Sequence, residues 1–155
     1  MNAPPFDIKM YGPNALLLEW PRKVDLKILM DILSFQEYLR KNHLSEDAWE
    51  FVPIYHSLTL INRAADAPME AIVKGLPDWY RACPKDHAPK TRRWELPVCY
   101  EEPFCLDLAD TARRLKMTPE ALVALHSGRD YRVYGIGFLP GFLYLGDIPE
   151  ALKIP

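Results

Sequence analysis

The sequence predicts an α+β protein: a small open-faced antiparallel α/β sandwich, followed by a smaller second domain. Short apolar stretches with strand character alternate with segments of helical periodicity, in the order strand-strand-helix-strand-helix. The stretch 83–93 is rich in proline and lysine and has no apolar period, so it marks a domain boundary. We therefore expect an N-terminal domain over residues 1–92 and a C-terminal domain over residues 93–155.

The N-terminal domain begins with two strands and a helix. The strands are expected at 6–10 and 14–20, joined by a turn at 11–13 that contains glycine and proline. The helix is predicted over 22–41, with Asp25 placing negative charge at its positive end. Its apolar face consists of Val24, Ile28, Ile32, Phe35 and Leu39, and its polar face of Lys23, Lys27, Asp31 and Arg40.

A further extended segment and a second helix complete this domain. Residues 49–62 are rich in aromatic and aliphatic side chains. Pro53 within them marks a bend, a turn or an edge position, because proline cannot donate to a sheet ladder. The second helix is predicted over 68–81, where Pro77 introduces a kink or a division. The apolar face of this helix is Met69, Ile72, Val73, Leu76 and Trp79.

The C-terminal domain is expected to contain a strand, two helices and a second strand. The strands are predicted at 94–100 and 131–136, and the first helix at 108–115. The second helix starts after Thr118, a favourable N-cap residue, and ends near 127–128. With roughly sixty residues, this domain is close to the size at which a hydrophobic core becomes marginal.

Composition indicates a globular protein and excludes several function classes. The chain has 155 residues, 49% of them hydrophobic, and a formal net charge of −2. Its one compact basic group, 90–93, is interpreted as a solvated linker, so we expect no nucleic-acid partner. Three cysteines without a C-x-x-C pair indicate neither disulfides nor a zinc site. No signal peptide is recognised, and we expect a cytoplasmic protein that binds no membrane and no metal.

The most unusual stretch is the uncharged run 133–146, which is rich in glycine and aromatic residues. It is shorter than the roughly 20 apolar residues of a membrane span, and its glycines and proline disfavour a helix. We expect a strand that ends at Ile136 and a tight loop whose rings line a cleft. The candidate substrate- or partner-binding residues are Gly137, Phe138, Pro140, Gly141, Phe142 and Tyr144. The alternative is that these rings plug the core of the domain.

The sequence does not identify catalytic residues, and His126 is the one candidate. It closes the second short helix as a possible acid or base, and the alternative is a cation favoured at a helix C-terminus. His56 and Ser57 are adjacent in a predicted strand, so they point to opposite faces and form no nucleophile–base pair. Asp107 is expected to cap the following helix. The chain has no G-x-x-x-x-G-K phosphate loop and no metal-binding spacing.

Several motifs together resemble one known family. They are 52–58 (VPIYHSL), 96–100 (LPVCY), Asp107-Leu108, the helix 118–126 and the loop 137–146 (GFLPGFLYLG). In this order they resemble the kinase A inhibitor family, whose members are also called the B subunit of 5-oxoprolinase. The GF-x-PGF-x-Y-x-G loop is the most specific of these elements.

The resemblance implies a fold, partners and a function. Members of this family are similar to the first half of the carboxyltransferase domain of urea carboxylase, with a small α+β domain followed by a cyclophilin-like β-barrel. The chain is then expected to act with a companion subunit whose barrel is homologous, and with a third subunit, in the ATP-dependent hydrolysis of 5-oxoproline to glutamate. The assembled complex uses the ATP, and no cofactor is expected on this chain alone. The alternative activity is inhibition of a histidine kinase by blocking its autophosphorylation.

The chain departs from the family pattern on its C-terminal side. Family members continue past the position of Pro155 with further barrel strands, including a glycine-rich PGGW-type stretch, and this sequence lacks them. The resemblance therefore implies a truncated barrel, either incomplete or completed by another chain. A half-barrel exposes strand edges and an apolar face, which favours association.

Overall fold

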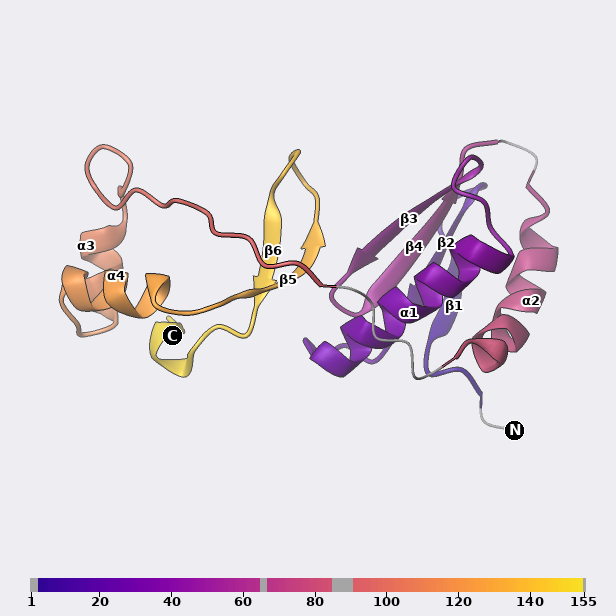
Figure 1. Ribbon diagram of the computed structural model, residues 1–155, viewed down its shortest axis with the longest axis horizontal. Helices are drawn as coiled ribbons and strands as arrows, with labels where there is room; N and C mark the ends of the chain where they lie inside the picture. The colour runs from indigo at the N-terminus through magenta and orange to yellow at the C-terminus, as the bar shows by residue number, and fades with distance from the viewer. Residues whose placement is uncertain (1–2, 65–66, 85–90, 155) are drawn as a thin grey trace. The chain divides into compact units, whose positions relative to one another are not determined.

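The structure is a computed structural model that describes residues 3–64, 67–84 and 91–154 (Figure 1). The chain divides into two compact units. The first comprises Met1–Lys90 together with Tyr134–Tyr144, and the second comprises Thr91–Val133 together with Leu145–Pro155. The predicted domain ranges, 1–92 and 93–155, stay a prediction. Residues 85–90 of the predicted boundary segment lie outside the described residues.

The first unit is built on a four-stranded antiparallel sheet with the strand order β1-β2-β4-β3. Its strands are β1 (Asp7–Met10), β2 (Ala15–Glu19), β3 (Trp49–Ile54) and β4 (Ser57–Asn62). Leu18 of β2 is paired with Ile8 of β1 and with Leu58 of β4, so one register runs across three strands. Every second residue of β4 is buried, as expected for a strand with one covered face. The two predicted N-terminal strands are confirmed.

The predicted extended segment 49–62 is a hairpin, in which Tyr55 and His56 form the two-residue turn between β3 and β4. Tyr55 has a φ of 50°, in the left-handed region that two-residue hairpin turns use. The prediction that His56 lies inside a strand was therefore wrong. The carbonyl of this residue accepts a hydrogen bond from the Trp20 amide (2.8 Å). Pro53 lies in the edge strand β3, one of the positions expected for it.

The first helix, α1 (Leu26–Asn42), starts later than predicted. Asp25 is its N-cap, and the Asp25 carboxylate accepts a hydrogen bond from the Lys27 amide (2.9 Å). Because Asp25 fixes the start of the helix, residues 22–24 lie outside it. Val24 is therefore half exposed and does not lie on the apolar face of α1. The buried positions of α1 are Leu29, Ile32, Phe35 and Leu39.

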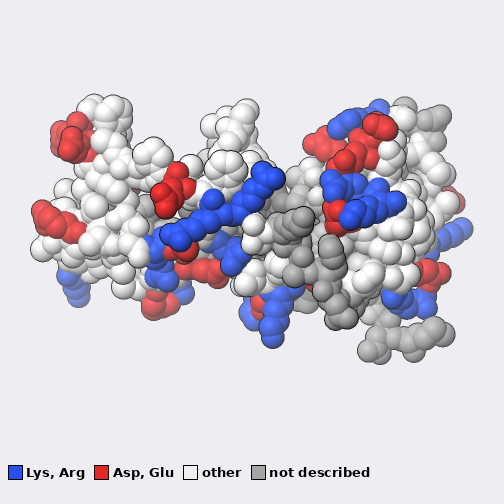
Figure 2. All heavy atoms as spheres, viewed as in Figure 1, with Lys and Arg blue, Asp and Glu red and all other residues white. Residues whose placement is uncertain are grey.

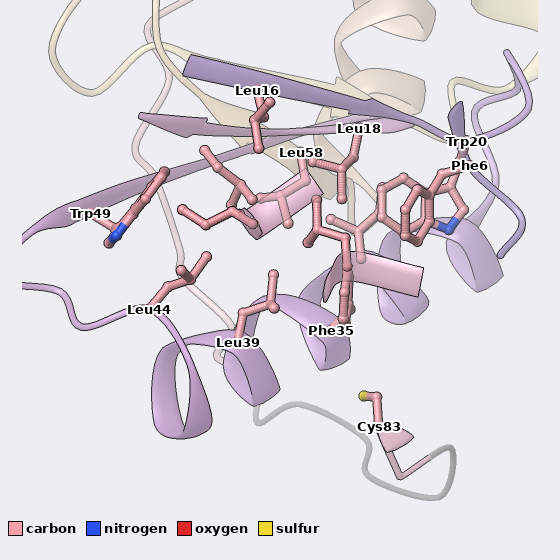
Figure 3. Close-up of a cluster of buried hydrophobic side chains, with 14 of the residues drawn as sticks. Phe6, Leu16, Leu18, Trp20, Phe35, Leu39, Leu44, Trp49, Leu58 and Cys83 are labelled. Carbon is pink, nitrogen blue, oxygen red and sulfur yellow. The ribbon is translucent and has the colours of Figure 1, made fainter. Parts of the chain in front are cut away.

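The second helix, α2 (Met69–Ala82), is confirmed and continues through Pro77 as one helix. It buries Met69, Ile72 and Leu76. One hydrophobic core joins both helices to the sheet. In Figure 3 the sheet residues Leu16, Leu18 and Leu58 point toward Phe35 and Leu39 of α1. The first unit is thus an antiparallel sheet with helices packed on it, as the sandwich prediction requires.

Asp31 lies on the predicted polar face of α1, but its carboxylate is bonded to other elements of the first unit. Its Oδ2 accepts hydrogen bonds from Trp20 Nε1 (2.8 Å) and from the Tyr80 hydroxyl (2.6 Å). Burial and the neighbouring carboxylate raise the pKa of Tyr80. This carboxylate therefore links α1 to α2 and to the residue that follows β2.

Charged residues of both signs are mixed on the face of the molecule shown in Figure 2. Within the first unit Arg40 pairs with Glu46 (2.9 Å), and within the second Arg93 pairs with Asp130 (3.0 Å). Such exposed ion pairs contribute little to stability. Arg92 and Arg93 are exposed, as expected for the described part of the predicted linker.

The second unit contains two short helices, α3 (Leu108–Arg114) and α4 (Pro119–Ser127). The start of α4 is as predicted, because the Thr118 hydroxyl accepts a hydrogen bond from the Ala121 amide (3.2 Å). Asp107 holds the N-cap position of α3, but its side chain makes no capping hydrogen bond, so the predicted capping role was wrong. Its φ of −112° and ψ of 1° depart from the extended backbone that directs a cap side chain at the helix amides.

The predicted strand 94–100 is not formed. Residues 91–100 have no regular secondary structure, and within the described part of the chain no strand pairs with them. A strand needs a neighbour for its N–H and C=O groups, so strand propensity alone does not create one. The apolar side chains Trp94, Leu96 and Val98 are exposed to 74%, 61% and 56%.

Strands β5 (Arg132–Ile136) and β6 (Leu143–Gly146) pair in a separate two-stranded sheet, and a short 3₁₀ helix, η1 (Glu150–Leu152), follows. The predicted strand 131–136 is confirmed, whereas β6 occupies part of what was expected to be a loop. The described residues form two antiparallel sheets and no closed barrel. The predicted α+β fold class is therefore confirmed, and the β-barrel of the second domain stays a prediction. No helix among them is long and apolar enough to cross a bilayer.

Candidate functional site

The glycine-aromatic loop connects β5 to β6 and consists of residues 137–142. Its own backbone closes it: the Gly137 amide donates to the Phe142 carbonyl (3.1 Å), and the Phe142 amide donates to the Leu139 carbonyl (3.0 Å). Phe138 and Gly141 have positive φ values of 63° and 82°. Two left-handed residues in six make a tight turn, and at Gly141 glycine allows this conformation at no steric cost. The predicted tight loop is confirmed, with a shorter span.

Two glycines at this hairpin serve different purposes. A Cβ added to Gly135 meets Ile54 Cγ1 at 3.0 Å and the Pro53 carbonyl oxygen at 3.3 Å, so this glycine lets β5 approach the end of β3 closely. A Cβ added to Gly141 meets nothing within 4 Å, so only its backbone conformation requires glycine there. The β5–β6 hairpin therefore packs closely against the end of β3 at Gly135, whereas no other atom lies close to Gly141 at its tip.

Five aromatic rings form a continuous row along this hairpin, which we call the aromatic row. Its members in order of contact are Tyr134, Tyr55, Tyr144, Phe142 and Phe138. Tyr134 stacks on Tyr55 with a centroid distance of 5.7 Å, and the later contacts are edge-to-face at 5.9, 5.2 and 5.9 Å. The Tyr55 amide also donates a hydrogen bond to the Tyr134 carbonyl (3.0 Å).

Exposure changes along the aromatic row. Tyr134 is 1% exposed and anchors it, whereas Phe142 and Phe138 are 47% and 83% exposed. Of the predicted loop residues, the structure thus brings Phe138, Phe142 and Tyr144 into contact, and it leaves Pro140 exposed beside them. Their assignment as binding residues stays a prediction.

The sequence prediction did not include two members of the aromatic row. Tyr134 lies inside the predicted strand 131–136, and the sequence of a single strand does not fix its register in a sheet. Tyr55 belongs to another hairpin, and its contact with β5 joins distant parts of the chain. An aromatic residue at the tip of a two-residue turn is a signal that could have drawn attention to it.

A group of polar aromatic side chains around His126 lies in the second unit. His126, in the last turn of α4, has its Nδ1 2.5 Å from the Tyr100 hydroxyl oxygen. The Tyr131 ring lies against the His126 ring with a centroid distance of 5.4 Å. The Tyr131 hydroxyl oxygen is buried, and no group in the described part of the chain pairs with it. Burial raises the pKa of Tyr131.

The described residues contain no cluster of three His, Cys, Asp or Glu side chains that could hold a metal ion. No disulfide joins the three cysteines in the described part of the chain; Cys83 is buried, Cys105 is half-buried and Cys99 is exposed. The side chains around His126 offer hydrogen-bonding groups, and the aromatic row offers apolar contact.

Comparison with known proteins places the chain in a family. The family model for the carboxyltransferase domain, subdomain C and D, matches residues 6–155. The chain belongs to this family. The match confirms the family that the motifs indicated, including the relation to carboxyltransferase domains.

Two curated relatives are named as the B subunit of 5-oxoprolinase. The protein of Bacillus subtilis (strain 168) is 22% identical over 160 residues, covering 97% of this chain and 66% of the relative. The protein of Escherichia coli O157:H7 is 33% identical over 106 residues, covering 68% of this chain and 48% of the relative. The chain thus spans about two thirds and about half of these relatives.

Among solved structures, a crystal structure of a protein called TTHA0988 resembles the chain. The TM-score is 0.71 at 29% sequence identity, over 91% of this chain and 27% of that protein. The fold of the present chain therefore recurs as one part of TTHA0988, which is a much longer polypeptide.

Proposed function

We propose that the chain is a cytoplasmic subunit of a 5-oxoprolinase-like enzyme, which hydrolyses 5-oxoproline to glutamate with ATP. One observation carries this proposal: the chain aligns over 97% of its length with a protein named as the B subunit of 5-oxoprolinase. The family match over residues 6–155 supports it, because it excludes a likeness confined to one motif.

The proposed enzyme works only as an assembly. The word subunit in the names of the relatives implies other chains, and the companion is a subunit with a homologous barrel. This chain has no G-x-x-x-x-G-K loop, so ATP is used by the complex and no cofactor is held by this chain alone. The two-stranded sheet of β5 and β6 and the apolar segment 94–98 are parts of a cyclophilin-like barrel that needs further strands.

The aromatic row has the properties of a wall in a cleft that the companion completes. Its outer rings, Phe138 and Phe142, present exposed apolar faces, and its inner ring, Tyr134, is fixed in the first unit. Aromatic residues anchored in this way supply much of the energy of protein interfaces at a low entropic cost. The loop residues Gly137, Pro140, Gly141 and Tyr144 complete the surface proposed to contact substrate or partner.

Co-expression with the companion and third subunits tests the proposal. We expect the purified complex to release glutamate from 5-oxoproline only when ATP is present. The control is the same complex assembled with the Bacillus subtilis relative in place of this chain. Glutamate release by the control and none by the complex with this chain would contradict the proposal. In that case inhibition of histidine-kinase autophosphorylation is the activity to measure next.

A further inference from the structure

The second unit contains an exposed segment, residues 92–102, which we call the edge segment. In Figure 1 it runs as an extended stretch of chain toward the loop before α3. Among the described residues, no backbone hydrogen bond joins positions 92–100 to another segment. Positions 92–99 are exposed, and Tyr100 is half-buried. An extended backbone whose N–H and C=O groups are unpaired is a template on which another strand can pair.

Apolar residues occupy every second position of the edge segment: Trp94, Leu96, Val98 and Tyr100. In an extended chain such residues share one face, and their N–H and C=O groups point to the same edge. Pro97 lacks an N–H group, but it lies at an odd-numbered position, so the missing donor belongs to the opposite edge. The edge formed by the even-numbered residues therefore has a complete set of donors and acceptors.

The two ends of the edge segment carry opposite charges. Arg92 and Arg93 precede the apolar positions, and Glu101 and Glu102 follow them. When two copies pair antiparallel about Pro97, position 92 lies opposite 102 and position 93 lies opposite 101. Both arginines of each copy then face glutamates of the other, whereas a parallel pair would bring like charges together. A shift of two residues in either direction removes both arginine–glutamate pairs, so the segment is complementary to itself in one register.

The same register also suits the apolar residues and the proline. Trp94 lies opposite Tyr100 of the second copy, and Leu96 lies opposite Val98. These even-numbered pairs use the complete edge, so they are the hydrogen-bonded pairs of the antiparallel ladder. The pairs between them are not hydrogen-bonded, and Pro97 opposite Pro97 is one of these. The missing N–H group of this proline therefore costs the ladder nothing.

We infer that two copies of the chain associate through the edge segment, which pairs antiparallel with itself across a two-fold axis at Pro97. The inference does not rest on the proposed function. Such an interface is isologous, so both copies contribute the same residues. Arg93 already pairs with Asp130 (3.0 Å), but both side chains are exposed, so exchanging this partner for a glutamate costs little. The competing occupant of the edge segment is a strand of the companion subunit.

A charge exchange followed by sedimentation equilibrium of the full chain tests the inference. The wild type is expected to reach twice the mass of a single chain as its concentration rises. R92E/R93E has glutamates at both ends of the segment, and E101R/E102R has arginines at both, so each is expected to dimerise at least about tenfold more weakly than the wild type. An equimolar mixture of the two variants is expected to restore the dimer. Restoration also shows that both variants are folded.

Two proline substitutions test which edge pairs. V98P removes an N–H group from the proposed pairing edge, whereas C99P removes one from the opposite edge. Both positions are exposed, so neither change disturbs a core. V98P is expected to weaken the dimer at least about tenfold, and C99P is the matched control, which is expected to leave it unchanged.

A cysteine at the two-fold axis tests the register. The Cα atoms of a pair without hydrogen bonds lie about 4.5 Å apart, within the range of about 4.4–6.8 Å that a disulfide spans. P97C is therefore expected to form a disulfide-linked dimer on mild oxidation. The wild type is the control, because its exposed Cys99 lies opposite Glu95 and not opposite a cysteine.

Each possible outcome decides for or against the inference. A wild-type chain that remains a monomer up to its solubility limit overturns it. A dimer that neither the charge variants nor V98P weakens also overturns it, because the contact then lies elsewhere. A monomer whose amides at 94–100 become protected from hydrogen exchange only with the companion assigns the segment to that subunit. This last result overturns the inference and leaves the proposed function standing.

Discussion

The carboxylate of Asp31 accepts hydrogen bonds from Trp20 and Tyr80, which are 11 and 49 positions away in the sequence. Helical periodicity placed Asp31 correctly on the polar side of α1. Periodicity describes one helix, however, and contains no information on what packs beside it. The contact could therefore not be predicted from the sequence. The same limit applies to Asp107, whose residue type favours capping but whose backbone does not.

Removing the Tyr80 hydroxyl tests the contribution of this contact. Y80F is expected to lower the free energy of unfolding by about 1–2 kcal/mol, since it removes a hydrogen bond to a half-buried carboxylate and leaves the ring packing in place. Urea denaturation of the full chain measures the change. Y11F is the control, because Tyr11 is exposed in a turn. Equal midpoints for Y80F and the control would show that the contact contributes nothing.

The raised pKa of Tyr80 predicts how stability changes with alkaline pH. Burial and then Asp31 raise this pKa above the ordinary value near 10, so the unfolded chain loses the phenol proton before the folded chain does. The stability due to the protonated phenol is complete below pH 10 and is lost as pH rises above it. Denaturation at several pH values is expected to show a steeper alkaline loss for the wild type than for Y80F. Parallel curves would contradict this.

At the scale of the elements, the helices and the first two strands follow from local signals. Asp25 and Thr118 cap α1 and α4 as their residue types favour. The strand predicted at 94–100 does not form and β6 was not predicted, and both of these errors concern strands. A helix satisfies its hydrogen bonds within its own segment, whereas a strand needs a neighbour that local sequence does not specify.

The β5–β6 hairpin allows a matched test of close packing. G135A is expected to destabilise the chain by about 1–3 kcal/mol, because the added Cβ meets Ile54 at 3.0 Å and the Pro53 carbonyl at 3.3 Å. G137A is the control: its Cβ meets Tyr144 at 3.7 Å, an ordinary contact, and it is expected to cost less than about 1 kcal/mol. Urea denaturation compares the two. A larger loss for G137A would mean that β5 does not rest on β3 as described.

The aromatic row predicts opposite effects at its two ends. Y134A is expected to cost about 3 kcal/mol or more, because that ring is 1% exposed. F142A is expected to cost about 1 kcal/mol, because Phe142 is 47% exposed, and to reduce turnover of the assembled enzyme. Denaturation and glutamate release measure the two effects. A loss of about 3 kcal/mol for F142A would support the alternative that the loop plugs a core.

At the scale of the whole molecule, the mixed class was predictable, because strand and helix patterns succeed one another along the chain. The barrel was inferred from family resemblance, and the described residues contain only two of its candidate strands, β5 and β6. The candidate loop was found from composition, since uncharged runs of rings and glycines are rare in ordinary connectors. Its anchoring to Tyr55 was not found, because it depends on how two hairpins meet.

Hydrogen exchange in the assembled complex tests the loop as a contact surface. The amides of residues 137–142 are expected to exchange more slowly when the companion is present, because exposed rings at an interface exclude water from the backbone beside them. The exposed turn around Tyr11 is the internal control and is expected to exchange equally with and without the companion. F138A, at an 83% exposed ring, should weaken companion binding about tenfold with little loss of stability. Unchanged exchange of the loop in an active complex would show that the companion binds elsewhere.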